Sequence, residues 1–517
     1  MKKSSTGNQA GQPKYQSDVA ELMNLIDASP MNKKAAKGKI CTGLCEDSRK
    51  IKPGDLYIAR PGLKSDGRRY IHQAVSRGAI AVLCEATAIS QFVQAAKCPV
   101  DIYKIKKLAN KLGLLGDIFY QKPSAELTII GVTGTNGKTT CTQLIALVAE
   151  KLNKNVAVMG TLGNGQLAKL EETGNTTTDA LTIQAQLAKF RDDKIDIVSM
   201  EVSSHALLQG RVNAINFNLA LFTNLTRDHL DYHGDMKNYA TSKKMLLAKD
   251  GLQAVIINAD DAMGLSFIED RDITADKYSF SITAINARQS HNSVWTESVV
   301  FHDKGIEAEI ITPWGNVDFK SSMIGQFNLS NCLAVITSLG ILGFTPKEVA
   351  AQLETISFVP GRMERFGGYD RPLVIVDYAH TPDALKNVLQ AIKPHTSNKL
   401  WAVFGCGGDR DPGKRSEMAA IAEEYADRLV FTSDNPRSEK VEDIINEMLK
   451  GLNSSTAYEV EVDRKLAIRN SISKSLIGDV ILVAGKGREQ HQKIGAIEYP
   501  HNDVEIVEAA LESGRWV

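Results

Sequence analysis

The sequence contains few cysteines, and none of them forms a closely spaced pair. Seven cysteines are scattered over 517 residues, at positions 41, 45, 84, 98, 141, 332 and 406, without a C-x-x-C motif. An odd number without a regular pattern fits reduced thiols better than a framework of disulfides. We therefore assign the cysteines no functional role.

The sequence also lacks long hydrophobic runs and an excess of either charge. No stretch approaches the roughly 18 uncharged apolar residues that cross a bilayer, and residues 1–16 are polar, without the apolar segment of a signal peptide. The 61 basic and 61 acidic side chains cancel to a formal net charge of zero, which argues against binding nucleic acid through its phosphates. We expect a cytoplasmic monomer with no membrane partner and no nucleic-acid partner.

Length and composition indicate a globular enzyme of several domains. At roughly 150 residues per domain, 517 residues suggest about three domains, and 43% hydrophobic with 24% charged residues is typical of a soluble protein. Breaks at Lys122-Pro123 and Pro360-Gly361 separate these domains. We expect a flexible polar segment (1–38) with one short helix near Val19–Ile26, an N-terminal domain (39–125), a central domain (126–359) and a C-terminal domain (360–517).

The apolar runs predict an α/β fold in each domain. Short strands at 56–59 and 79–84 alternate with helical patterns in the N-terminal domain. The central domain alternates strands and helices, which implies a mostly parallel sheet, and the pattern between Lys277 and Met323 suggests an antiparallel β insert. In the C-terminal domain four strands lead through polar turns into helices, as in doubly wound, Rossmann-like sheets. Ligands bind beyond the carboxyl ends of such strands, where we find Asp377, Arg410, Asp434 and Gly485.

The most informative motif is the segment 131–140, GVTGTNGKTT, which lies between an apolar run and a helical pattern. Glycines let backbone N–H groups turn toward phosphate oxygens, the ammonium of Lys138 reaches the outer phosphates, and the hydroxyl of Thr139 can bind Mg²⁺. The motif is shorter than the usual G-x-x-x-x-G-K-[ST], because the glycine before Gly137 is Gly134. A glycine turn that only caps a helix is the alternative, but it leaves the Lys-Thr pair unexplained. The loop therefore predicts an ATP site.

Two further strand ends carry polar side chains downstream of this loop. The apolar run 195–200 ends at Glu201, and the run 219–223 is followed by His229 with two acids nearby. Carboxylate and imidazole groups are suited to binding metal ions. Either segment alone could be a solvated polar loop. Together with a phosphate-binding loop they are candidates for a metal site.

The shortened loop resembles that of the Mur ligases and of the related folylpolyglutamate synthases, which form amide bonds through an acyl phosphate. Further segments match the Mur ligases across nearly the whole chain after residue 43. They are Asp47-Ser-Arg49, Asp66-Gly-Arg-Arg-Tyr70, Asn175-Thr-Thr177, Gly325-Gln-Phe-Asn328 with Asn331, Pro360-Gly-Arg362, Asp377-Tyr-Ala-His-Thr-Pro382, Asp434-Asn-Pro-Arg437 and Ala484-Gly-Lys-Gly487. The first two and the last two segments resemble the members that add meso-2,6-diaminopimelate to UDP-N-acetylmuramoyl-L-alanyl-D-glutamate in the cytoplasmic synthesis of peptidoglycan.

The resemblance implies an ATP site with Mg²⁺ and a modified lysine. The implied ATP-binding residues are Gly134, Thr135, Asn136, Gly137, Lys138, Thr139, Thr140, Asn328, Asn331, Arg362, Asp377 and His380. The implied metal-binding residues are Thr139, Glu201, His229 and a carbamylated Lys243 (N6-carboxylysine), and the implied catalytic residues are Lys138, Glu201, His229 and Lys243. Without the resemblance, Lys243 would be assigned as an ordinary lysine on a helix surface. An ammonium beside Mg²⁺ has a lowered pKa, which exposes the amine to CO₂, and the carbamate presents two oxygens to a metal.

The resemblance also implies two further substrate sites. The UDP-linked muramoyl dipeptide would be bound by Glu46, Ser48, Leu63, Lys64, Ser65, Asn175, Thr176, Thr177, Ser203, Gln209 and Arg211. Diaminopimelate would be bound by Arg410, Asp434, Asn435, Pro436, Arg437, Gly485 and Glu489. Arg437 could pair bidentately with the distal carboxylate, although Asp-Asn-Pro also starts ordinary turns. Glu46 stands where relatives often have an apolar residue, near the expected uridine contacts, and Arg488 replaces a usual histidine, where we expect it to edge the amino-acid pocket.

The implied reaction is an ATP-dependent ligation that requires domain closure. ATP phosphorylates the glutamyl carboxylate while Lys138 and Mg²⁺ offset the charge of the γ-phosphoryl group, and the amine of diaminopimelate then attacks the acyl phosphate. A ligase that adds L-lysine is the nearest alternative, which Arg437 disfavours. A folylpolyglutamate synthase would lack the N-terminal segments at 47–49 and 66–70. A non-catalytic nucleotide-binding scaffold would be expected to have lost Lys138, Glu201 or His229.

Overall fold

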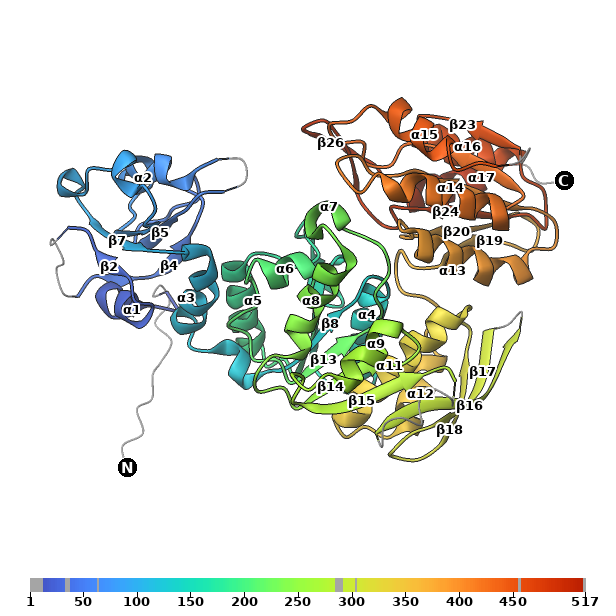
Figure 1. Ribbon diagram of the computed structural model, residues 1–517, viewed down its shortest axis with the longest axis horizontal. Coiled ribbons are helices and arrows are strands. Elements are labelled where there is room, and N and C mark those ends of the chain that lie inside the picture. Colours follow the sequence, from blue (N-terminus) through green and yellow to red (C-terminus); the bar gives the residue numbers. More distant parts are fainter. Residues whose placement is uncertain are drawn as a thin grey trace. The chain divides into compact units, whose positions relative to one another are not determined.

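The computed structural model describes residues 13–32, 38–62, 65–283, 292–302, 305–453 and 457–514 (Figure 1). Residues 1–12 of the expected polar segment and the expected contacts Leu63 and Lys64 lie outside the described residues. The chain forms two compact units, of which the first contains the chain up to Thr128 with Thr177–Ile195 and His205–Asn216. The second contains Ile129–Thr176, Asp196–Ser204 and Phe217–Val517. Over the described ranges, no helix combines the length and the apolarity needed to cross a membrane.

The first unit has a five-stranded sheet in the order β2-β7-β6-β5-β4, in which β4 to β7 are parallel. Its strands are β1 (Ser17–Asp18), β2 (Ser29–Pro30), β3 (Ile40–Cys41), β4 (Gly43–Cys45), β5 (Asp55–Ala59), β6 (Ala81–Glu85) and β7 (Asp101–Ile105). Its helices are α1 (Val19–Leu25), α2 (Ile71–Ser76), α3 (Leu112–Phe119) and α5 (Ala180–Asp192), with short 3₁₀ turns η1 (Gly67–Tyr70), η2 (Ile89–Gln91), η3 (Ala95–Lys97), η4 (Leu108–Lys111) and η5 (Pro123–Glu126). Because β5 is buried along its whole length, its sequence DLYIA does not alternate between polar and apolar residues.

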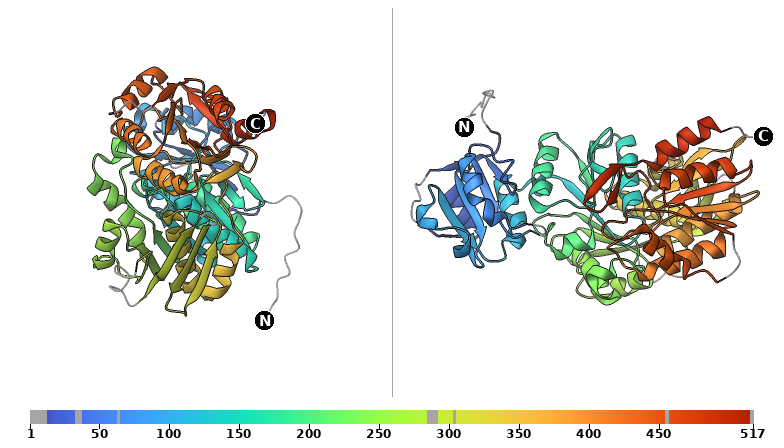
Figure 2. Two further views of the ribbon diagram at one scale, coloured as in Figure 1. Left: turned by 90° about the vertical axis from the view of Figure 1, so that its right-hand side faces the viewer. Right: turned by 90° about the horizontal axis from the view of Figure 1, so that it is seen from above.

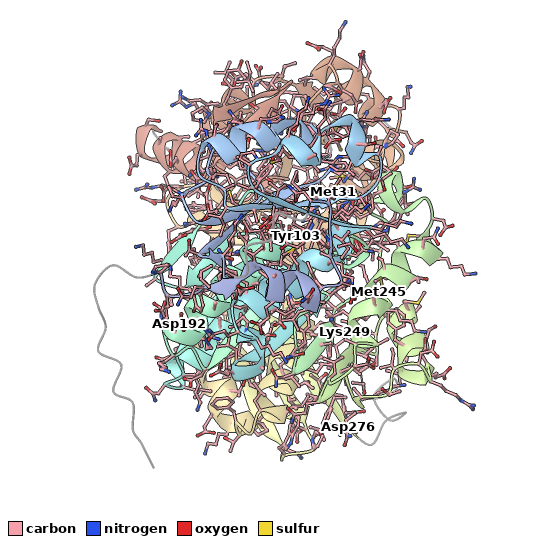
Figure 3. All side chains as sticks on the ribbon, turned by 90° about the vertical axis from the view of Figure 1, so that its left-hand side faces the viewer. Met31, Tyr103, Asp192, Met245, Lys249 and Asp276 are labelled. Carbon is pink, nitrogen blue, oxygen red and sulfur yellow. The ribbon has the colours of Figure 1, made fainter. Side chains whose placement is uncertain are left out.

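Part of the expected flexible segment belongs to this unit. Helix α1 begins after Asp18, whose side chain accepts a hydrogen bond from the backbone N–H of Glu21. The apolar face of α1 packs into a core that includes Tyr103, which is labelled in Figure 3. Lys14 forms an ion pair with Asp192, with 2.7 Å between Nζ and Oδ2. The first unit therefore begins well before residue 39.

Helix α5 also departs from the expected domain limits, because it lies within 126–359 but clusters with the first unit. Leu181 joins the core that contains α1 and α3. A Cβ atom on Gly116 of α3 would lie 2.9 Å from Cβ of Gln184 on α5. The two helices therefore approach closely only because position 116 has no side chain.

The central part of the second unit is built on one eleven-stranded sheet, in the order β11-β10-β9-β12-β8-β13-β14-β15-β16-β17-β18. Its strands are β8 (Thr128–Thr133), β9 (Val156–Gly160), β10 (Gly163–Gln166), β11 (Lys169–Glu171), β12 (Ile197–Glu201), β13 (Leu219–Phe222), β14 (Ala254–Asn258), β15 (Asp276–Ser281), β16 (Ser293–His302), β17 (Gly305–Ile311) and β18 (Val317–Ser321). The helices of this region are α4 (Lys138–Lys151), α7 (Leu230–His233), α8 (Met236–Leu247), α9 (Ala262–Glu269), α11 (Gln326–Ile341) and α12 (Pro346–Glu354). Helix α6 (Ser204–Leu208) clusters with the first unit from His205 on. The pairs β9–β12, β8–β13 and β13–β14 are parallel, as the alternation of strands and helices predicted.

The segment between Lys277 and Met323 is only partly the antiparallel insert that its pattern suggested. Strand β15 pairs in parallel with β14, and β16 pairs in parallel with β15, so both strands continue the main sheet. The antiparallel pairs are β16–β17 and β17–β18 at the edge. The alternation of apolar and polar residues shows which face of a strand is buried, but it does not show whether the neighbouring strand runs parallel or antiparallel. For this reason the sequence pattern did not predict the parallel pairing of β15 and β16.

The C-terminal part is a doubly wound domain with the strand order β19-β20-β24-β21-β22-β23. Its strands are β19 (Glu364–Gly367), β20 (Leu373–Asp377), β21 (Leu400–Phe404), β22 (Arg428–Phe431), β23 (Tyr458–Val460), β24 (Val480–Ala484) and the separate hairpin β25 (His491–Ile494) with β26 (Ile497–Pro500). Its helices are α13 (Pro382–Ile392), η6 (Lys393–His395), α14 (Gly413–Tyr425), α15 (Val441–Leu449), α16 (Arg464–Lys474) and α17 (Asp503–Ser513). Helices cover both faces of this sheet (Figure 2). One apolar cluster involves α13 to α15, and a second involves α16 and α17.

The parallel strands β20, β24, β21 and β22 end at one edge of this sheet. Asp377 is the last residue of β20, and Gly485 follows β24 directly. Arg410 lies in the turn after β21, and Asp434 lies in the turn after β22. The four turns expected at one sheet edge are therefore brought together.

Candidate functional site

The glycine loop joins β8 to α4, as its sequence predicted. Gly134 and Gly137 have φ angles of 148° and 83°, in the region that favours glycine. A Cβ on Gly134 would lie 1.8 Å from Oγ1 of Thr223, and one on Gly137 would lie 2.8 Å from Oδ1 of Asn331. Both glycines are therefore required by the conformation of the loop and by close neighbours.

Neutral hydrogen bonds fix the loop to the segment that follows β13. The backbone N–H groups of Thr135 and Asn136 donate to the backbone and side-chain oxygens of Asn224, at 2.9 and 2.8 Å. The hydroxyl of Thr223 donates to the carbonyl of Asn136 at 2.6 Å. The loop is thus held before any ligand contributes.

Lys138 and Thr139 lie at the start of α4 with their polar groups at the loop. The Nζ atom of Lys138 donates to the carbonyls of Gly134 and Thr135, both at 2.9 Å. Burial and the charge of Arg362 lower the pKa of Lys138, whereas the nearby carboxylate of Glu201 acts to raise it. The hydroxyl of Thr139 donates to Oε2 of Glu201 at 3.0 Å, so the sequence-predicted pair is brought together.

Glu201 ends β12 and is 1% exposed. Its carboxylate also accepts hydrogen bonds from the backbone N–H and the hydroxyl of Thr161, at 2.8 and 3.2 Å. A Cβ on Gly160 would lie 2.3 Å from Oε1 of this carboxylate. The chain therefore makes room for a buried carboxylate beside the phosphate-binding loop.

His229 lies near a buried carboxylate that sequence reasoning did not assign to the site. Asp228 is 4% exposed, and its oxygens lie 3.3 Å from Nε2 of His229, 3.8 Å from Nε2 of His380 and 3.5 Å from Nζ of Lys414. Burial acts to raise the pKa of Asp228, but the neighbouring charges of Lys414, His229 and His380 hold it well below its usual range. The backbone of His229 is left-handed, with φ of 55°.

Lys243 is buried within α8 and is 1% exposed. Its Nζ atom lies 4.2 Å from the centre of the Tyr239 ring. Burial, and next the positive charge of Lys138, place the pKa of Lys243 well below its usual value. The neighbouring Lys244 instead forms ion pairs with Asp270 and Asp272, both at 2.6 Å. The surroundings of the two adjacent lysines therefore shift their pKa values in opposite directions, which favours Lys243 over Lys244 as the reactive amine.

The implied nucleotide residues beyond the loop come from α11 and from the start of the C-terminal domain. The Nη2 atom of Arg362 donates to the hydroxyl of Thr139 at 2.9 Å, and its guanidinium lies 4.3 Å from the centre of the Tyr378 ring. A recess with an empty volume of about 280 Å³ is lined by Thr140, Asn328 and Arg362, among other residues.

Asp377 is the last residue of β20, and His380 lies in the turn that follows it. The carboxylate of Asp377 accepts backbone hydrogen bonds from Met363 and Ala379 at 2.8 and 2.7 Å, and burial raises its pKa. The Nδ1 atom of His380 lies 2.9 Å from the carbonyl of Tyr378, and burial, with the charge of Lys414, lowers the pKa of this histidine. His380 is thus positioned by its own turn, whereas Asp377 is also fixed by the segment that precedes β19.

The residues implied for the muramoyl dipeptide are divided between the two units. Asn175, Thr176 and Ser203 belong to the second unit, and Thr177, Gln209 and Arg211 belong to the first. Within the first unit Arg211 donates to Oε1 of Gln209 and to the carbonyl of Thr177, at 2.6 and 2.5 Å. These three residues form one polar cluster.

Near the first strands, Ser48 and Glu46 already have protein partners. The hydroxyl of Ser48 donates to Oε1 of Gln73 at 2.7 Å. Glu46, the departure from the family pattern, forms an ion pair with Arg60, with 2.5 Å between Oε1 and Nε. The backbone of Ser65, which borders Leu63 and Lys64, accepts a hydrogen bond from Gly62.

In the C-terminal domain the turn 434–437 presents Arg437 in a constrained conformation. Its φ of 53° is left-handed, which is uncommon for a residue with a side chain. Its Nη1 atom donates to the carbonyl of Gly408 at 2.7 Å. Burial, and next the positive charge of Arg410, lower the pKa of Arg437. The carboxylates of Asp434, Glu489 and Asp409 act on this pKa in the opposite direction.

Asn435 and Glu489 form a hydrogen-bonded network beneath this turn. The side chain of Asn435 donates to Oε2 of Glu489 at 3.0 Å. The Nζ atom of Lys486, which is fully buried, lies 2.6 Å from the same oxygen. Sequence reasoning missed Lys486, although it lies inside the quoted segment 484–487, because its spacing gives no sign that it is buried. Asp434 lies beside Gly485, where a Cβ would be 2.7 Å from Oδ2.

Arg488 does not edge this network as expected. Its Nε and Nη2 atoms donate to the two carboxylate oxygens of Glu364 on β19, at 2.9 and 2.5 Å. The guanidinium is therefore directed toward the linker that precedes β19. The sequence gives no sign of this contact, because Glu364 lies far from Arg488 in the sequence.

Comparisons with known proteins agree with this architecture. Three family models match the chain: the Mur ligase family catalytic domain at residues 41–120, the Mur ligase middle domain at 132–339, and the Mur ligase glutamate ligase domain at 361–487.

Named relatives match over most of their length. The UDP-N-acetylmuramoyl-L-alanyl-D-glutamate–2,6-diaminopimelate ligase of Coxiella burnetii is 41% identical over 490 residues, which cover 95% of this chain and 99% of the relative. The protein of the same name from Pseudomonas aeruginosa is 43% identical over 465 residues, which cover 90% and 94%. A solved structure of a ligase with this name is 32% identical, with a TM-score of 0.65, and the match covers 96% of this chain and 99% of that one.

Proposed function

Because the chain belongs to the Mur ligase family, we propose that it joins meso-2,6-diaminopimelate to UDP-N-acetylmuramoyl-L-alanyl-D-glutamate, with ATP as co-substrate. The names of the relatives support this assignment. The observation that supports it is the arrangement of two groups of cationic side chains, Lys138 at the glycine loop and Arg437 with Arg410 at the turn of the C-terminal domain. The protein would work in the cytoplasm, as a monomer, in the synthesis of peptidoglycan.

The nucleotide loop supplies the groups that ATP and Mg²⁺ require. Lys138 would move from the loop carbonyls to the outer phosphates, and the hydroxyl of Thr139 with the carboxylate of Glu201 offers the oxygen donors that Mg²⁺ prefers. Bound Mg²⁺ would offset the charge of the transferring phosphoryl group. Among the described residues, no group of three or more His, Cys, Asp and Glu side chains is arranged to hold a metal. Other ligands are therefore needed besides Glu201 and His229.

We assign one of these further ligands to a carbamate on Lys243. An amine must be neutral to attack CO₂, and the burial of Lys243 together with the charge of Lys138 favours the neutral form. In this step a bond forms between Nζ and the carbon of CO₂, and one proton passes to solvent. The resulting carbamate carries a negative charge and two oxygen donors beside the loop.

The reaction would proceed in two transfers. An oxygen of the glutamyl carboxylate attacks the γ-phosphorus of ATP and ADP leaves, with Lys138 and Arg362 placed to stabilise the charge. The neutral amine of diaminopimelate then attacks the acyl carbon, and phosphate leaves with the bond electrons. Arg437 would hold the distal carboxylate of diaminopimelate through a bidentate pair, supported by Arg410.

The polar residues named above would bind the muramoyl dipeptide. In the first unit, Thr177, Gln209 and Arg211 already form a cluster of donors and acceptors suited to sugar and carboxylate oxygens. Ser48 and Glu46 would lie at the uridine end. The ion pair of Glu46 with Arg60 means that Glu46 need not bind substrate directly.

A direct assay tests this proposal against its nearest alternatives. Purified protein would be incubated with ATP, the UDP-linked dipeptide and labelled diaminopimelate or L-lysine, with Lys138→Ala as the inactive control. We expect a labelled tripeptide with diaminopimelate only. A product with lysine alone would replace this proposal by the lysine-adding alternative, and ATP hydrolysis without any amide product would contradict ligation. Light scattering of the same preparation tests the monomeric state.

A further inference from the structure

The side chain of Arg488 connects the amino-acid loop to the linker between the central and C-terminal domains. Its bidentate contact reaches Glu364, which is 3% exposed. The same carboxylate accepts a hydrogen bond from the backbone N–H of Gly361, with 2.8 Å between Oε2 and N. Glu364 therefore joins Arg488 to the residue that immediately precedes Arg362.

The backbone of the loop and the backbone of the linker also touch. A Cβ on Gly361 would lie 2.9 Å from the backbone nitrogen of Arg488, and a Cβ on Gly487 would lie 2.8 Å from the carbonyl oxygen of Gly361. Both glycines have positive φ angles, of 69° and 56°. The backbone at Gly361 therefore packs directly against the backbone at Gly487 and Arg488. A side chain at either glycine would not fit.

Arg362 is held from a second side by the same loop. Its guanidinium lies 4.3 Å from the centre of the Tyr378 ring, and a Cβ on Gly487 would lie 3.3 Å from Cβ of Tyr378. The Nη2 atom of Arg362 then donates to the hydroxyl of Thr139 in the nucleotide loop. A continuous series of contacts thus runs from Arg488 to the residue that follows Lys138.

We infer that Arg488 is a positioning residue for the nucleotide site, which acts through Glu364 and Gly361 to hold Arg362 at the phosphate-binding loop. This inference rests on the proposed function, because it takes Arg362 as a nucleotide contact. Without the guanidinium of Arg488, the buried carboxylate of Glu364 keeps only its hydrogen bond from the backbone of Gly361. The linker is then no longer tied to the loop that carries Arg488. The loss of Arg488 should therefore weaken the binding of ATP and not that of diaminopimelate, although Arg488 is a sequence neighbour of Glu489.

The test compares Arg488→Met with Arg488→Lys and with a matched control. Arg488→Met keeps most of the length of the side chain and removes its charge, and Arg488→Lys keeps the charge without the planar fork. Lys393→Met is the control, because Lys393 forms an ion pair with Asp427 elsewhere in the same domain and is similarly exposed, at 47% against 43% for Arg488.

In steady-state kinetics we expect Arg488→Met to raise the KM for ATP about tenfold, with less than a twofold change in the KM for diaminopimelate. Arg488→Lys should restore part of the loss, and Lys393→Met should behave like the wild type. A selective rise in the KM for diaminopimelate would overturn the inference and restore the role at the edge of the amino-acid pocket.

Two further measurements separate this inference from the proposed function. The Kd for ADP, measured by calorimetry with magnesium chloride and without any other substrate, should rise about tenfold in Arg488→Met, and an unchanged Kd would overturn the inference. Glu364→Gln keeps an acceptor for Gly361, and the double variant should bind ADP no more weakly than Glu364→Gln alone. Additive losses would show that Arg488 does not act through Glu364. Failure of the wild type to form the tripeptide would instead refute the proposed function, while the ADP measurements would still decide the inference.

Discussion

The nucleotide loop and the amino-acid turns, which we propose as two anion sites, both lie at the ends of parallel strands, but different interactions hold them. Neutral hydrogen bonds from Thr223 and Asn224 fix the nucleotide loop. In the C-terminal domain, the fully buried Arg464 donates to the carbonyls of Ser433 and Ala484, at 3.3 and 2.9 Å, and so joins the residues that precede Asp434 and Gly485. Its charge is balanced by Asp503, at 2.7 Å.

The kind of interaction that holds each site determines which change should disrupt it. The nucleotide loop depends on glycine conformations and on local backbone bonds, so it should tolerate changes of pH and lose function mainly when a charged side chain is removed. The amino-acid turns depend on a buried ion pair, and the removal of either partner leaves an unpaired buried charge. The turns should therefore be more sensitive to acid than the loop.

The largest effect is expected from Lys138→Ala. Its ammonium contacts only the loop carbonyls in this structure and packs in no apolar core, so the fold should persist. Loss of its charge at the transferring phosphoryl group should reduce the rate of product formation by on the order of 10³-fold or more. Product formation and far-ultraviolet circular dichroism, measured on the same sample, check both parts. Near-normal turnover would remove the ATP site from this loop.

A similar loss is expected for Lys243→Ala, because the proposed carbamate supplies an anionic group beside the loop. Addition of short carboxylic acids should restore part of the activity, whereas Lys244→Ala should keep it, since Lys244 pairs with acids at the surface of α8. Activity assays with and without acetate give the comparison. Full activity of Lys243→Ala, or an unmodified amine in a crystal structure of the active enzyme at neutral pH, would contradict the carbamate.

Arg437→Ala should weaken the binding of diaminopimelate at the amino-acid turns and leave the binding of ATP at the nucleotide loop unchanged. If Arg437 pairs with the distal carboxylate, the wild type should discriminate against lysine by about 10⁴-fold, because lysine leaves a half-buried guanidinium without its partner. The variant should lose most of its activity with diaminopimelate through a raised KM, while the KM for ATP stays nearly constant. It need not gain activity with lysine, because Arg410 and Glu489 remain. Comparable wild-type values of kcat/KM for the two amino acids would be incompatible with this assignment.

The two sites also differ in how far the sequence predicted them. The loop was recognisable because glycine, lysine and threonine at fixed spacing describe a backbone conformation, and the structure agrees at Gly134 and Gly137. The strand ends at Asp377 and Gly485 were predicted in the same way, from apolar runs followed by turns.

The sequence could not predict contacts between residues that lie far apart in the chain. Arg464 and Asp503 lie outside the quoted segments, and nothing in their neighbourhood marks them as a buried pair. Lys414 was missed for the same reason, since its partner Asp228 belongs to the central domain. The order of strands at the edge of the central sheet was also out of reach, because periodicity does not specify whether β15 and β16 run parallel.

The smallest effect, and the sharpest test of the comparison, is the response to acid. Burial acts to raise the pKa of Asp503, but its contact with Arg464, with a further contribution from His501, holds this pKa well below its usual value. A carboxyl whose pKa is depressed in the folded state contributes stability above its unfolded pKa of about 4, and this contribution is lost as the pH falls below that value. The C-terminal domain should therefore lose up to about 1.4 kcal/mol per pH unit through this group.

Hydrogen exchange at residues 431–437 and 484–489, compared with residues 131–140, would measure this loss. Between pH 4 and pH 2.5 we expect the wild-type turns to lose protection relative to the loop, after correction for the intrinsic exchange rates. In Asp503→Asn the turns should be less protected already at pH 7, and the difference between turns and loop should change little with acid, because the titrating group is gone. If the nucleotide loop loses protection first in the wild type, the buried ion pair is not what makes the two anion sites different, and the neutral hydrogen bonds around Thr223 and Asn224 are the weaker support.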